Sequence, residues 1–290
     1  MPRLFFCFGL GYSALAVARK LQAEGWEIAG TCRSAEKQAA LAAEGIAAFR
    51  FDRDRPLGDP AAALGGATHL LSAVPPDTAG DPVLDHHGGD LARVPSLLWA
   101  GYLSTTGVYG DRGGGWVDES SQLRPTGERG RRRVAAEAGW LALGRQGRLP
   151  IHIFRLAGIY GPGRSALDAV RRGEAKRIEK PGQVFSRIHV EDIAAALAAS
   201  MARPHPGAVY NLCDDDPAPP HEVVTYACAL LGVAPPPLVP FAEAELSAMA
   251  RSFYDDNKRV DNTRLKLELG VTLKYPSYRE GLAALLRSSA

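Results

Sequence analysis

Three small residues near the N-terminus have the types and the spacing that a dinucleotide pyrophosphate requires. Gly9, Gly11 and Ala14 follow an apolar run, Leu4 to Phe8, and open a helix-like stretch, Ala14 to Ala23. In such a turn the first glycine makes the sharp bend, the second lets phosphates reach the backbone, and the small third residue lets helix and strand pack closely. The phosphate charge then rests on N–H groups at the helix start. The pattern therefore predicts a cofactor site at Gly9, Gly11, Tyr12, Ser13 and Ala14; the alternative is an ordinary glycine-rich turn.

The end of the next apolar stretch, Trp26 to Thr31, indicates which dinucleotide is bound. An acidic residue there would bind the ribose hydroxyls of NAD, whereas a basic residue accommodates the 2′-phosphate of NADP. Here Arg33 and Ser34 follow the strand, and the first carboxylate is that of Glu36. A guanidinium binds a phosphate through two hydrogen bonds, and the Ser34 hydroxyl lies beside it. We expect NADP rather than NAD; a solvated loop arginine is the alternative.

Two further residues, each at the end of a predicted strand, are candidates for contact with the cofactor. Asp52 comes after a third strand, Ala47 to Phe51, where folds of this kind often contact the adenine amino group, although it could equally begin a turn from Asp52 to Pro56. Ala73 lies near the end of a fourth strand, His69 to Val74. Since ligands bind at the carboxyl ends of such strands, we expect both residues to line the cofactor site.

Strands and helical patterns alternate over the first 213 residues. Further strands are expected at Trp99–Ser104, Pro150–Leu156 and Ala208–Leu212, and helices at Glu36–Glu44, Pro60–Leu64, Arg132–Leu143 and Val190–Met201. Such alternation is typical of βαβ units and of α/β proteins with a parallel, doubly wound sheet. The sequence predicts a Rossmann-type sheet with a smaller, mostly helical C-terminal substrate lobe.

Two segments depart from the sheet pattern and are predicted to form that lobe. Residues 159-186 interrupt the alternation, and residues 214-290 contain proline clusters, which break regular elements. We therefore expect an NAD(P)-binding domain from 1-158 and 187-213. The substrate-binding lobe is expected from 159-186 and 214-290, with helices at His221–Leu231, Glu243–Arg251 and Asn262–Leu269.

Composition restricts the partners and the compartment. The 290 residues carry a formal net charge of +2, which gives no reason to expect a nucleic acid or a membrane surface as partner. The four cysteines are scattered without a Cys-x-x-Cys spacing, so the sequence predicts neither a zinc site nor a disulfide framework. No apolar run approaches about 18 residues, and no export signal follows Met1. We expect a cytoplasmic protein.

Four motifs beyond residue 100 resemble a known superfamily. They are Leu-Ser-Thr-Thr-Gly-Val-Tyr-Gly at 103–110, Arg-Leu-Ala-Gly-Ile-Tyr-Gly-Pro at 155–162, Arg-Ile-His-Val-Glu-Asp at 187–192 and Val-Tyr-Asn-Leu at 209–212. With the glycine turn, they are similar in kind and order to motifs of the extended short-chain dehydrogenase/reductases, which include nucleotide-sugar epimerases and dehydratases. The resemblance spans residues 3 to 213 and implies an NAD(P) cofactor.

Catalysis in that superfamily uses a Ser or Thr and a Tyr-x-x-x-Lys pair, whose lysine lowers the pKa of the proton-exchanging tyrosine. Thr105 matches the Ser/Thr position. Matching the family's glutamate to Glu137 puts Arg133 at the lysine position and Arg129 at the tyrosine position. Arginine stays protonated, so Arg129 cannot exchange a proton as tyrosine does. The chain thus resembles atypical members that lack the tyrosine, and Arg133 is expected to act as a fixed cation at the nicotinamide ribose.

Another acid must serve if hydride transfer occurs. Tyr109 follows Thr105 at the same sheet edge, and a neighbouring arginine would lower the pKa of its phenol. The alternative is that Tyr109 packs the loop, as it does in active relatives. Tyr160 and His189 are weaker candidates from the family motifs, and Glu119 is either an acid–base group or an ordinary exposed loop glutamate.

Charged and histidine clusters suggest further ligands. Basic residues crowd the segment after the sixth strand, namely Arg171, Arg172, Lys176, Arg177, Lys180 and Arg187. In extended relatives this region contacts the diphosphate of a nucleotide sugar, so the resemblance implies an anionic substrate; a solvated helix face is an equally good interpretation of the cluster. The adjacent His86 and His87 have no third ligand at a recognisable spacing, so we expect a loop or helix start there rather than a metal site.

Two functional hypotheses follow. The first is an NADP-dependent oxidoreductase or epimerase/dehydratase-like enzyme for an anionic small molecule, with Thr105 binding the reacting oxygen. The second is an NADP-binding sensor or scaffold protein without turnover. Extended relatives commonly dimerise through helices after the fourth and fifth strands, so a homodimer is the expected assembly.

Overall fold

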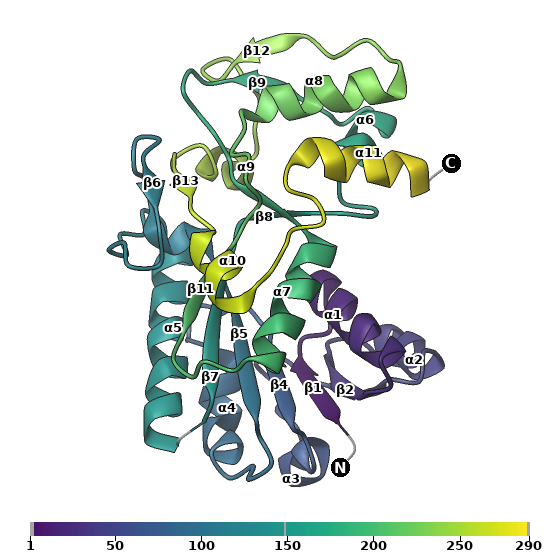
Figure 1. The fold of residues 1–290 in the computed structure, drawn as a ribbon, viewed down its shortest axis with the longest axis vertical. Helices are drawn as coiled ribbons and strands as arrows, with labels where there is room; N and C mark the ends of the chain where they lie inside the picture. The colour runs from purple at the N-terminus through teal and green to yellow at the C-terminus, as the bar shows by residue number, and fades with distance from the viewer. Residues whose placement is uncertain (1–2, 148, 289–290) are drawn as a thin grey trace. The chain divides into compact units, whose positions relative to one another are not determined.

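The computed structural model describes residues 3–147 and 149–288, which form two compact units. Unit 1 contains the chain up to Thr105 together with Arg131–Arg155 and Ile193–Tyr210. Unit 2 contains Thr106–Gly130, Leu156–Asp192 and the chain from Asn211 onward. Figure 1 shows that the chain passes between the units several times, so each is assembled from segments far apart in the sequence.

Seven strands form one sheet in the order β11-β7-β5-β4-β1-β2-β3. These are β1 (Leu4–Phe8), β2 (Glu27–Cys32), β3 (Ala47–Arg50), β4 (His69–Ser72), β5 (Trp99–Thr105), β7 (Ile151–Leu156) and β11 (Val209–Leu212). The pairs β1–β2, β1–β4, β2–β3 and β4–β5 are parallel. This is the strand order of a Rossmann sheet, so the predicted fold class is confirmed.

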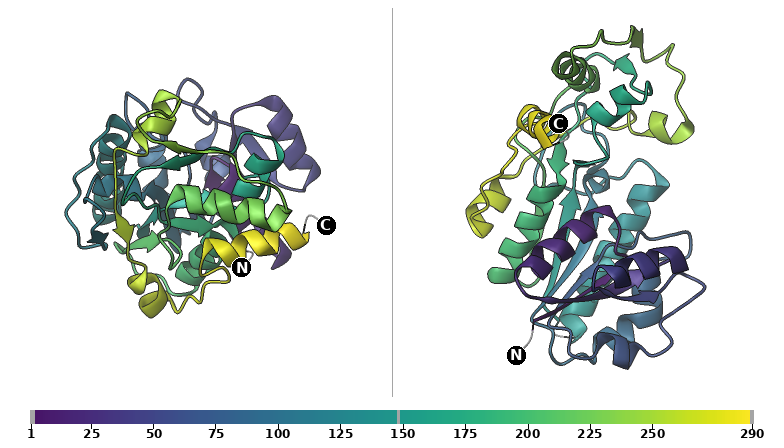
Figure 2. Two further views of the ribbon diagram at one scale, coloured as in Figure 1. Left: turned by 90° about the horizontal axis from the view of Figure 1, so that it is seen from above. Right: turned by 90° about the vertical axis from the view of Figure 1, so that its right-hand side faces the viewer.

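Helices cover the two faces of this sheet in unit 1 (Figure 2). One face packs against α3 (Pro60–Leu64), α4 (Pro82–Leu91) and α5 (Glu128–Gly147), where the side chains of Phe8, Tyr102 and Trp140 are fully buried. The other face meets α1 (Tyr12–Ala23) and α7 (Val190–Ala202), while α2 (Ala35–Ala43) contacts β2 and β3. On that second face the Trp99 indole N–H donates to the Ser200 hydroxyl of α7 at 3.0 Å.

A buried ion pair fixes α5 to the strands of unit 1. Arg155 of β7 and Glu137 of α5 are 4% and 3% exposed, and Arg155 Nη2 lies 2.8 Å from Glu137 Oε2. The Ser104 hydroxyl of β5 donates to Glu137 Oε1 at 2.5 Å. Because both charges are desolvated, each depends on the other and on these hydrogen bonds.

Unit 2 is mostly helical, with short strand pairs. Its helices are α6 (Ala166–Arg171), α8 (Pro220–Leu231), α9 (Ala248–Ser252), α10 (Thr263–Leu269) and α11 (Tyr278–Ser288). Its strand pairs are β8 (Gly158–Tyr160) with β10 (Arg187–His189), β9 (Arg177–Glu179) with β12 (Leu238–Pro240), and β6 (Trp116–Val117) with β13 (Arg259–Val260). Leu167, Val223 and Leu282 join α6, α8 and α11 in one apolar core.

Asn257 holds three segments of unit 2 together with five hydrogen bonds. Its backbone N–H donates to Asp111 Oδ1 at 2.8 Å, and its carbonyl accepts from the N–H groups of residues 112 and 114, each at 2.9 Å. Its side-chain amide donates to Gly182 O at 2.9 Å and accepts from Val184 N at 3.1 Å. One asparagine therefore satisfies polar groups of two loops that precede it by more than 70 residues.

Three predicted elements differ from the structure. The helix expected from Glu243 begins only at Ala248, because the Ser247 hydroxyl caps it by accepting from Ala250 N at 3.2 Å. Helix α5 begins at Glu128 rather than at residue 132, so the arginine run forms its first turns. His86 and His87, expected in a loop or at a helix start, lie in the middle of α4.

No helix within residues 3–147 and 149–288 is both long enough and apolar enough to cross a membrane.

Candidate functional site

The glycine turn after β1 has the geometry predicted for it. Gly9 adopts φ +85°, a left-handed conformation, and its N–H donates to the Thr31 hydroxyl at 2.8 Å. A Cβ at Gly9 would lie 3.1 Å from Val74 Cγ2, so the sharp bend needs glycine. At Gly11 (φ −89°) the nearest atom to an added Cβ would be Gly9 O at 3.9 Å. The fold itself therefore does not demand glycine at position 11, whereas close approach of a ligand would.

The start of α1 differs from that of its neighbours. Gly11 occupies the N-cap position, and no side chain caps the helix there. By contrast, Ser34, Asp59 and Asp81 cap α2, α3 and α4 with side-chain oxygens. An uncapped N-terminus presents backbone N–H donors and the positive end of the helix dipole, which suits a phosphate. Ala14, in the first turn, is 1% exposed, as expected for the small residue between helix and strand.

Three basic residues, Arg33, Lys37 and Arg50, lie near the end of β2. Arg33 is exposed, and the Ser34 hydroxyl accepts from Lys37 N at 3.2 Å. Arg50 is the register partner of Cys32 across β2 and β3. Burial raises the pKa of the Cys32 thiol, and the nearby cations Lys37 and Arg50 act in the opposite direction. Arg33 was predicted from the sequence, whereas Lys37 and Arg50 were not, although Lys37 follows the Ser34 cap by one helical turn.

Two further predicted cofactor residues, Asp52 and Ala73, lie in loops after β3 and β4. Asp52 forms a turn in which its N–H and carbonyl both pair with Arg55, and its carboxylate accepts from Asp54 N at 3.0 Å. The turn considered as an alternative is thus present, and its geometry leaves the contact with adenine a prediction. Ala73 N donates to Phe8 O at 2.8 Å, which places Ala73 directly beside the strand that leads to Gly9.

Thr105 and Arg133 both lie near the carboxyl end of β5 within unit 1. Thr105 is the last residue of the strand and is partly exposed. Arg133 of α5 donates through Nη1 to Leu103 O at 2.5 Å and to the Tyr102 hydroxyl at 3.2 Å. Its guanidinium carbon lies 5.6 Å from the Tyr102 ring centroid. The cation is therefore held at the strand end, two residues before Thr105.

Tyr109 lies in the interior of unit 2. Its side chain is 0% exposed, and its hydroxyl donates to Asn211 Oδ1 at 2.7 Å. The Asn211 N–H donates in turn to Glu119 Oε1 at 2.7 Å. These contacts favour the packing alternative for Tyr109. Glu119 is partly buried rather than an exposed loop residue, and burial raises the pKa of its carboxyl.

Tyr160 and His189 also pack within unit 2. Their ring centroids are 5.1 Å apart, and His189 lies 4.1 Å from the ring of Tyr275. His189 is fully buried, and this burial lowers its pKa to about 4, so its imidazole is neutral at pH 7. Burial raises the pKa of the Tyr160 phenol, whose hydroxyl donates to Ser277 O at 3.3 Å. Both residues support the packing of unit 2.

The basic residues after the sixth predicted strand are largely used by the backbone of unit 2. Lys176 Nζ donates to Glu245 O at 2.6 Å, and Arg177 Nη1 donates to Pro236 O at 3.0 Å. Lys180 donates to Tyr254 O, and Arg187 donates to the carbonyls of residues 185 and 218. Arg171 and Arg172, at the end of α6, are exposed, and Arg172 pairs with Glu174 at 2.7 Å, so these two fit the solvated helix face considered as the alternative. The other four do not form a free cluster of positive charge. Their acceptors lie up to 74 residues away in sequence, so the sequence pattern gave no signal of them.

Nothing in the described ranges indicates a metal centre. No group of three or more His, Cys, Asp or Glu side chains in residues 3–147 and 149–288 is placed to hold a metal ion. His86 Nε2 bonds to Arg53 O at 2.8 Å, and His87 Nε2 accepts from Leu57 N at 3.1 Å. Both imidazoles therefore already have backbone partners.

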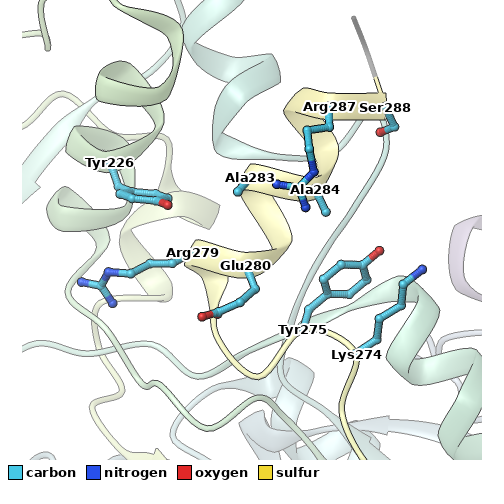
Figure 3. A pocket seen from close by; sticks show the side chains of 9 residues that line it. All are labelled: Tyr226, Lys274, Tyr275, Arg279, Glu280, Ala283, Ala284, Arg287 and Ser288. Carbon is cyan, nitrogen blue, oxygen red and sulfur yellow. The ribbon is translucent and has the colours of Figure 1, made fainter.

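A depression of about 810 Å³ lies on unit 2 against α11 (Figure 3). It is lined by Tyr226, Lys274, Tyr275, Arg279, Glu280, Ala283, Ala284, Arg287 and Ser288. Lys274 already pairs with Glu191 and Arg279 with Asp216, each at 2.7 Å. With these cations neutralised, the lining does not identify a ligand.

The chain is similar in sequence and fold to several known proteins. Residues 100–213 match the model of the NAD dependent epimerase/dehydratase family. The chain is 53% identical to a solved, functionally unknown conserved protein from Silicibacter pomeroyi DSS, over 99% of each chain and with a TM-score of 0.91. A structure from Methylobacillus flagellatus, described as a candidate NAD-dependent epimerase/dehydratase, is 26% identical over 99% of this chain and 98% of that chain, with a TM-score of 0.74. Protein YeeZ of Escherichia coli K12 is 28% identical over 92% of this chain and 94% of YeeZ.

Proposed function

We propose that the chain is a member of the NAD-dependent epimerase/dehydratase family, whose model matches residues 100–213, and that unit 1 binds NADP. On this proposal the protein is an oxidoreductase or epimerase/dehydratase-like enzyme for an anionic small molecule. The observation that carries this proposal is the uncapped start of α1 behind the Gly9 turn. The cofactor would be held there by the N–H groups that follow Gly11, and at its far end by Arg33. When bound, its nicotinamide ring supplies a hydride acceptor or donor.

Two glycine substitutions separate the fold from the ligand at this turn. Gly9→Ala is expected to lower the free energy of unfolding by about 1–3 kcal/mol, because alanine is strained at φ +85° and crowds Val74. Gly11→Ala has room for its methyl group, so stability should fall by no more than about 1 kcal/mol, the cost of alanine at an N-cap, while NADPH affinity falls at least about tenfold. Urea denaturation and calorimetric titration measure both effects. Unchanged NADPH binding in Gly11→Ala would contradict the phosphate site.

The preference for NADP rests on the cations around the end of β2. Arg33 is exposed, Lys37 lies one helical turn into α2, and Arg50 ends β3 opposite Cys32. A 2′-phosphate has a charge that these side chains match, whereas the 2′-hydroxyl of NAD does not.

Arg33→Ala is expected to weaken NADPH binding about 10- to 100-fold, which corresponds to the loss of one or two charge-assisted hydrogen bonds. NADH binding should stay unchanged, because the substitution removes only a phosphate contact. Arg203→Ala is the matched control, since Arg203 is an exposed arginine of unit 1 that follows the end of α7. Titration of the three proteins with both nucleotides measures the effect; a wild type that prefers NADH would refute the NADP assignment.

Thr105 and Arg133 are our candidates for the reacting end of the cofactor. Thr105 would donate a hydrogen bond to the reacting oxygen of the substrate, and Arg133 would act as a fixed cation at the nicotinamide ribose. The contacts of Arg133 with Leu103 O and the Tyr102 hydroxyl support that role, because they fix its position beside the end of β5. Arginine stays charged, so neither residue replaces the proton exchange of a tyrosine.

The burial of Tyr109 supports a second candidate function, an NADP-binding sensor or scaffold protein, because it leaves the enzyme hypothesis without its first candidate acid. Its phenol is committed to Asn211, and residues 122–140 contain neither tyrosine nor lysine. An NADP-binding sensor or scaffold protein would need no proton exchange. A hydride-exchange screen with NADPH and pools of carbonyl compounds and sugar nucleotides distinguishes the two: turnover on any pool supports the enzyme, and tight NADPH binding without turnover supports the sensor.

A further inference from the structure

Arg53, in the turn after β3, binds two carboxylates, one from the loop between β4 and α4 (Asp77) and one from the first turn of α4 (Asp85). Its Nε and Nη2 lie 2.9 Å from the two oxygens of Asp77, and its Nη1 lies 2.5 Å from Asp85 Oδ2. Its side chain is 27% exposed, so both ion pairs are partly shielded from water, and the pair with Asp77 is bidentate. Such pairs fix orientation better than a single surface contact does.

Asp77 also forms hydrogen bonds with the backbone of its own loop. Its Oδ1 also accepts from Ala79 N at 2.8 Å and Gly80 N at 3.2 Å, and its backbone N–H donates to Gly80 O at 2.9 Å. The hydrogen bond from Arg53, more than the opposing effect of burial, lowers the pKa of Asp77 to about 2. The carboxylate is therefore ionised at neutral pH and organises residues 77–80 around the Arg53 guanidinium.

Two histidines of α4 hold the backbone of the same turn. His86 Nε2 bonds to Arg53 O at 2.8 Å, and Leu57 N donates to His87 Nε2 at 3.1 Å. His87 Nδ1 lies 2.9 Å from Asp90 Oδ2, which orients its ring. We call this set of contacts between residues 53–57 and residues 77–90 the Arg53 clamp.

The clamp joins two loops on either side of the glycine turn. In the sheet order β4-β1-β2-β3, the loops after β3 and β4 flank those after β1 and β2. Asp52, directly before Arg53, is the residue expected to contact adenine. The guanidinium itself faces two carboxylates, so it has no surplus positive charge with which to bind a phosphate.

We propose that Arg53 is a positioning residue for the adenosine half of the cofactor, which it serves by fixing the Asp52 turn before the cofactor binds. This inference rests on the proposed binding of NADP. A turn that is already ordered loses less conformational entropy when the ligand arrives, so the clamp raises affinity without touching the ligand.

The test compares Arg53→Ala and Arg53→Lys with the matched control Arg55→Ala, an exposed arginine of the same turn. The probes are NADPH, 2′,5′-ADP, which contains only the adenosine half, and reduced nicotinamide mononucleotide, which contains only the other half. Arg53→Ala is expected to weaken NADPH and 2′,5′-ADP by the same factor, about tenfold, and to leave the mononucleotide unaffected. Arg53→Lys should restore part of the loss, and Arg55→Ala should bind as the wild type does.

Other results would overturn the inference. If the wild type binds NADPH, and Arg53→Ala binds 2′,5′-ADP as tightly as the wild type does, then Arg53 does not position the adenosine half. If Arg53→Ala loses the mononucleotide by the same factor, its effect is a general loss of structure. Asp77→Asn, which keeps the side-chain volume, should reproduce the selective loss if Arg53→Ala does not fold. A wild type that binds no NADPH would refute the proposed function itself, which is a separate result.

Discussion

Replacing Glu137 by alanine is expected to lower the free energy of unfolding by about 3–5 kcal/mol, because it leaves the buried Arg155 guanidinium without its carboxylate. Glu137 is 3% exposed and accepts from Arg155 and from the Ser104 hydroxyl. Urea denaturation of the wild type and the variant measures the difference. Glu24→Ala, which removes an exposed glutamate at the end of α1, is the control and should cost less than about 1 kcal/mol.

A double substitution tests whether the loss comes from the unpaired charge. Glu137→Met with Arg155→Met removes both charges and fills similar volume, so it should cost less than Glu137→Ala alone. If the double variant is as unstable as the sum of the single variants, the two residues act independently. A loss below about 1 kcal/mol in Glu137→Ala would also contradict our account of α5.

Asp214 is expected to make the protein less stable as the pH rises from about 4 to about 8. It is 1% exposed, so its carboxylate is largely removed from water. Burial raises its pKa to about 8, although the Arg187 guanidinium acts in the opposite direction. An unfolded aspartate has a pKa of about 3.9. Between these values the folded state binds more protons than the unfolded state, so the free energy of unfolding falls by up to about 1.4 kcal/mol per pH unit.

Asp214→Asn removes this dependence, because an amide does not titrate. Its free energy of unfolding should exceed that of the wild type at pH 8, and the advantage should shrink toward pH 5. Urea denaturation at pH 5, 6, 7 and 8 measures both proteins. Asp54→Asn, at an exposed carboxylate, should follow the wild type at every pH. Parallel curves for the wild type and Asp214→Asn would show that Asp214 is ionised in the folded state.

The sheet of unit 1 could be predicted from the sequence because its signals are local. The apolar run Leu4–Phe8, the glycines after it and the helical pattern that follows are all encoded within about 20 residues, and the structure has β1 and α1 there. Helix α4 was missed because Gly88, Gly89 and two histidines dilute its apolar period. Its start is set by Pro82 and by the Asp81 cap, and both of these signals are local in the sequence.

The candidate site was predictable only where its residues follow strands. Gly9, Arg33 and Thr105 lie where the pattern predicted, at the carboxyl ends of β1, β2 and β5. The partners of Lys180 and Tyr109 were not predictable, because the carbonyl of Tyr254 and the amide of Asn211 lie 74 and 102 residues away. Charge alone suggested a ligand site around Lys180, whereas the backbone of unit 2 already uses that charge.

The five hydrogen bonds of Asn257 have a consequence for the order of folding. Asp111 precedes Asn257 by 146 residues, so this contact closes a very long loop, and contacts of that kind form slowly. During synthesis every segment of unit 1 is complete once Tyr210 has emerged, whereas residues 106–130 of unit 2 must wait for Asn257. We expect unit 1 to reach its native structure first, while the ribosome is still extending the C-terminal segment that supplies Asn257 to unit 2.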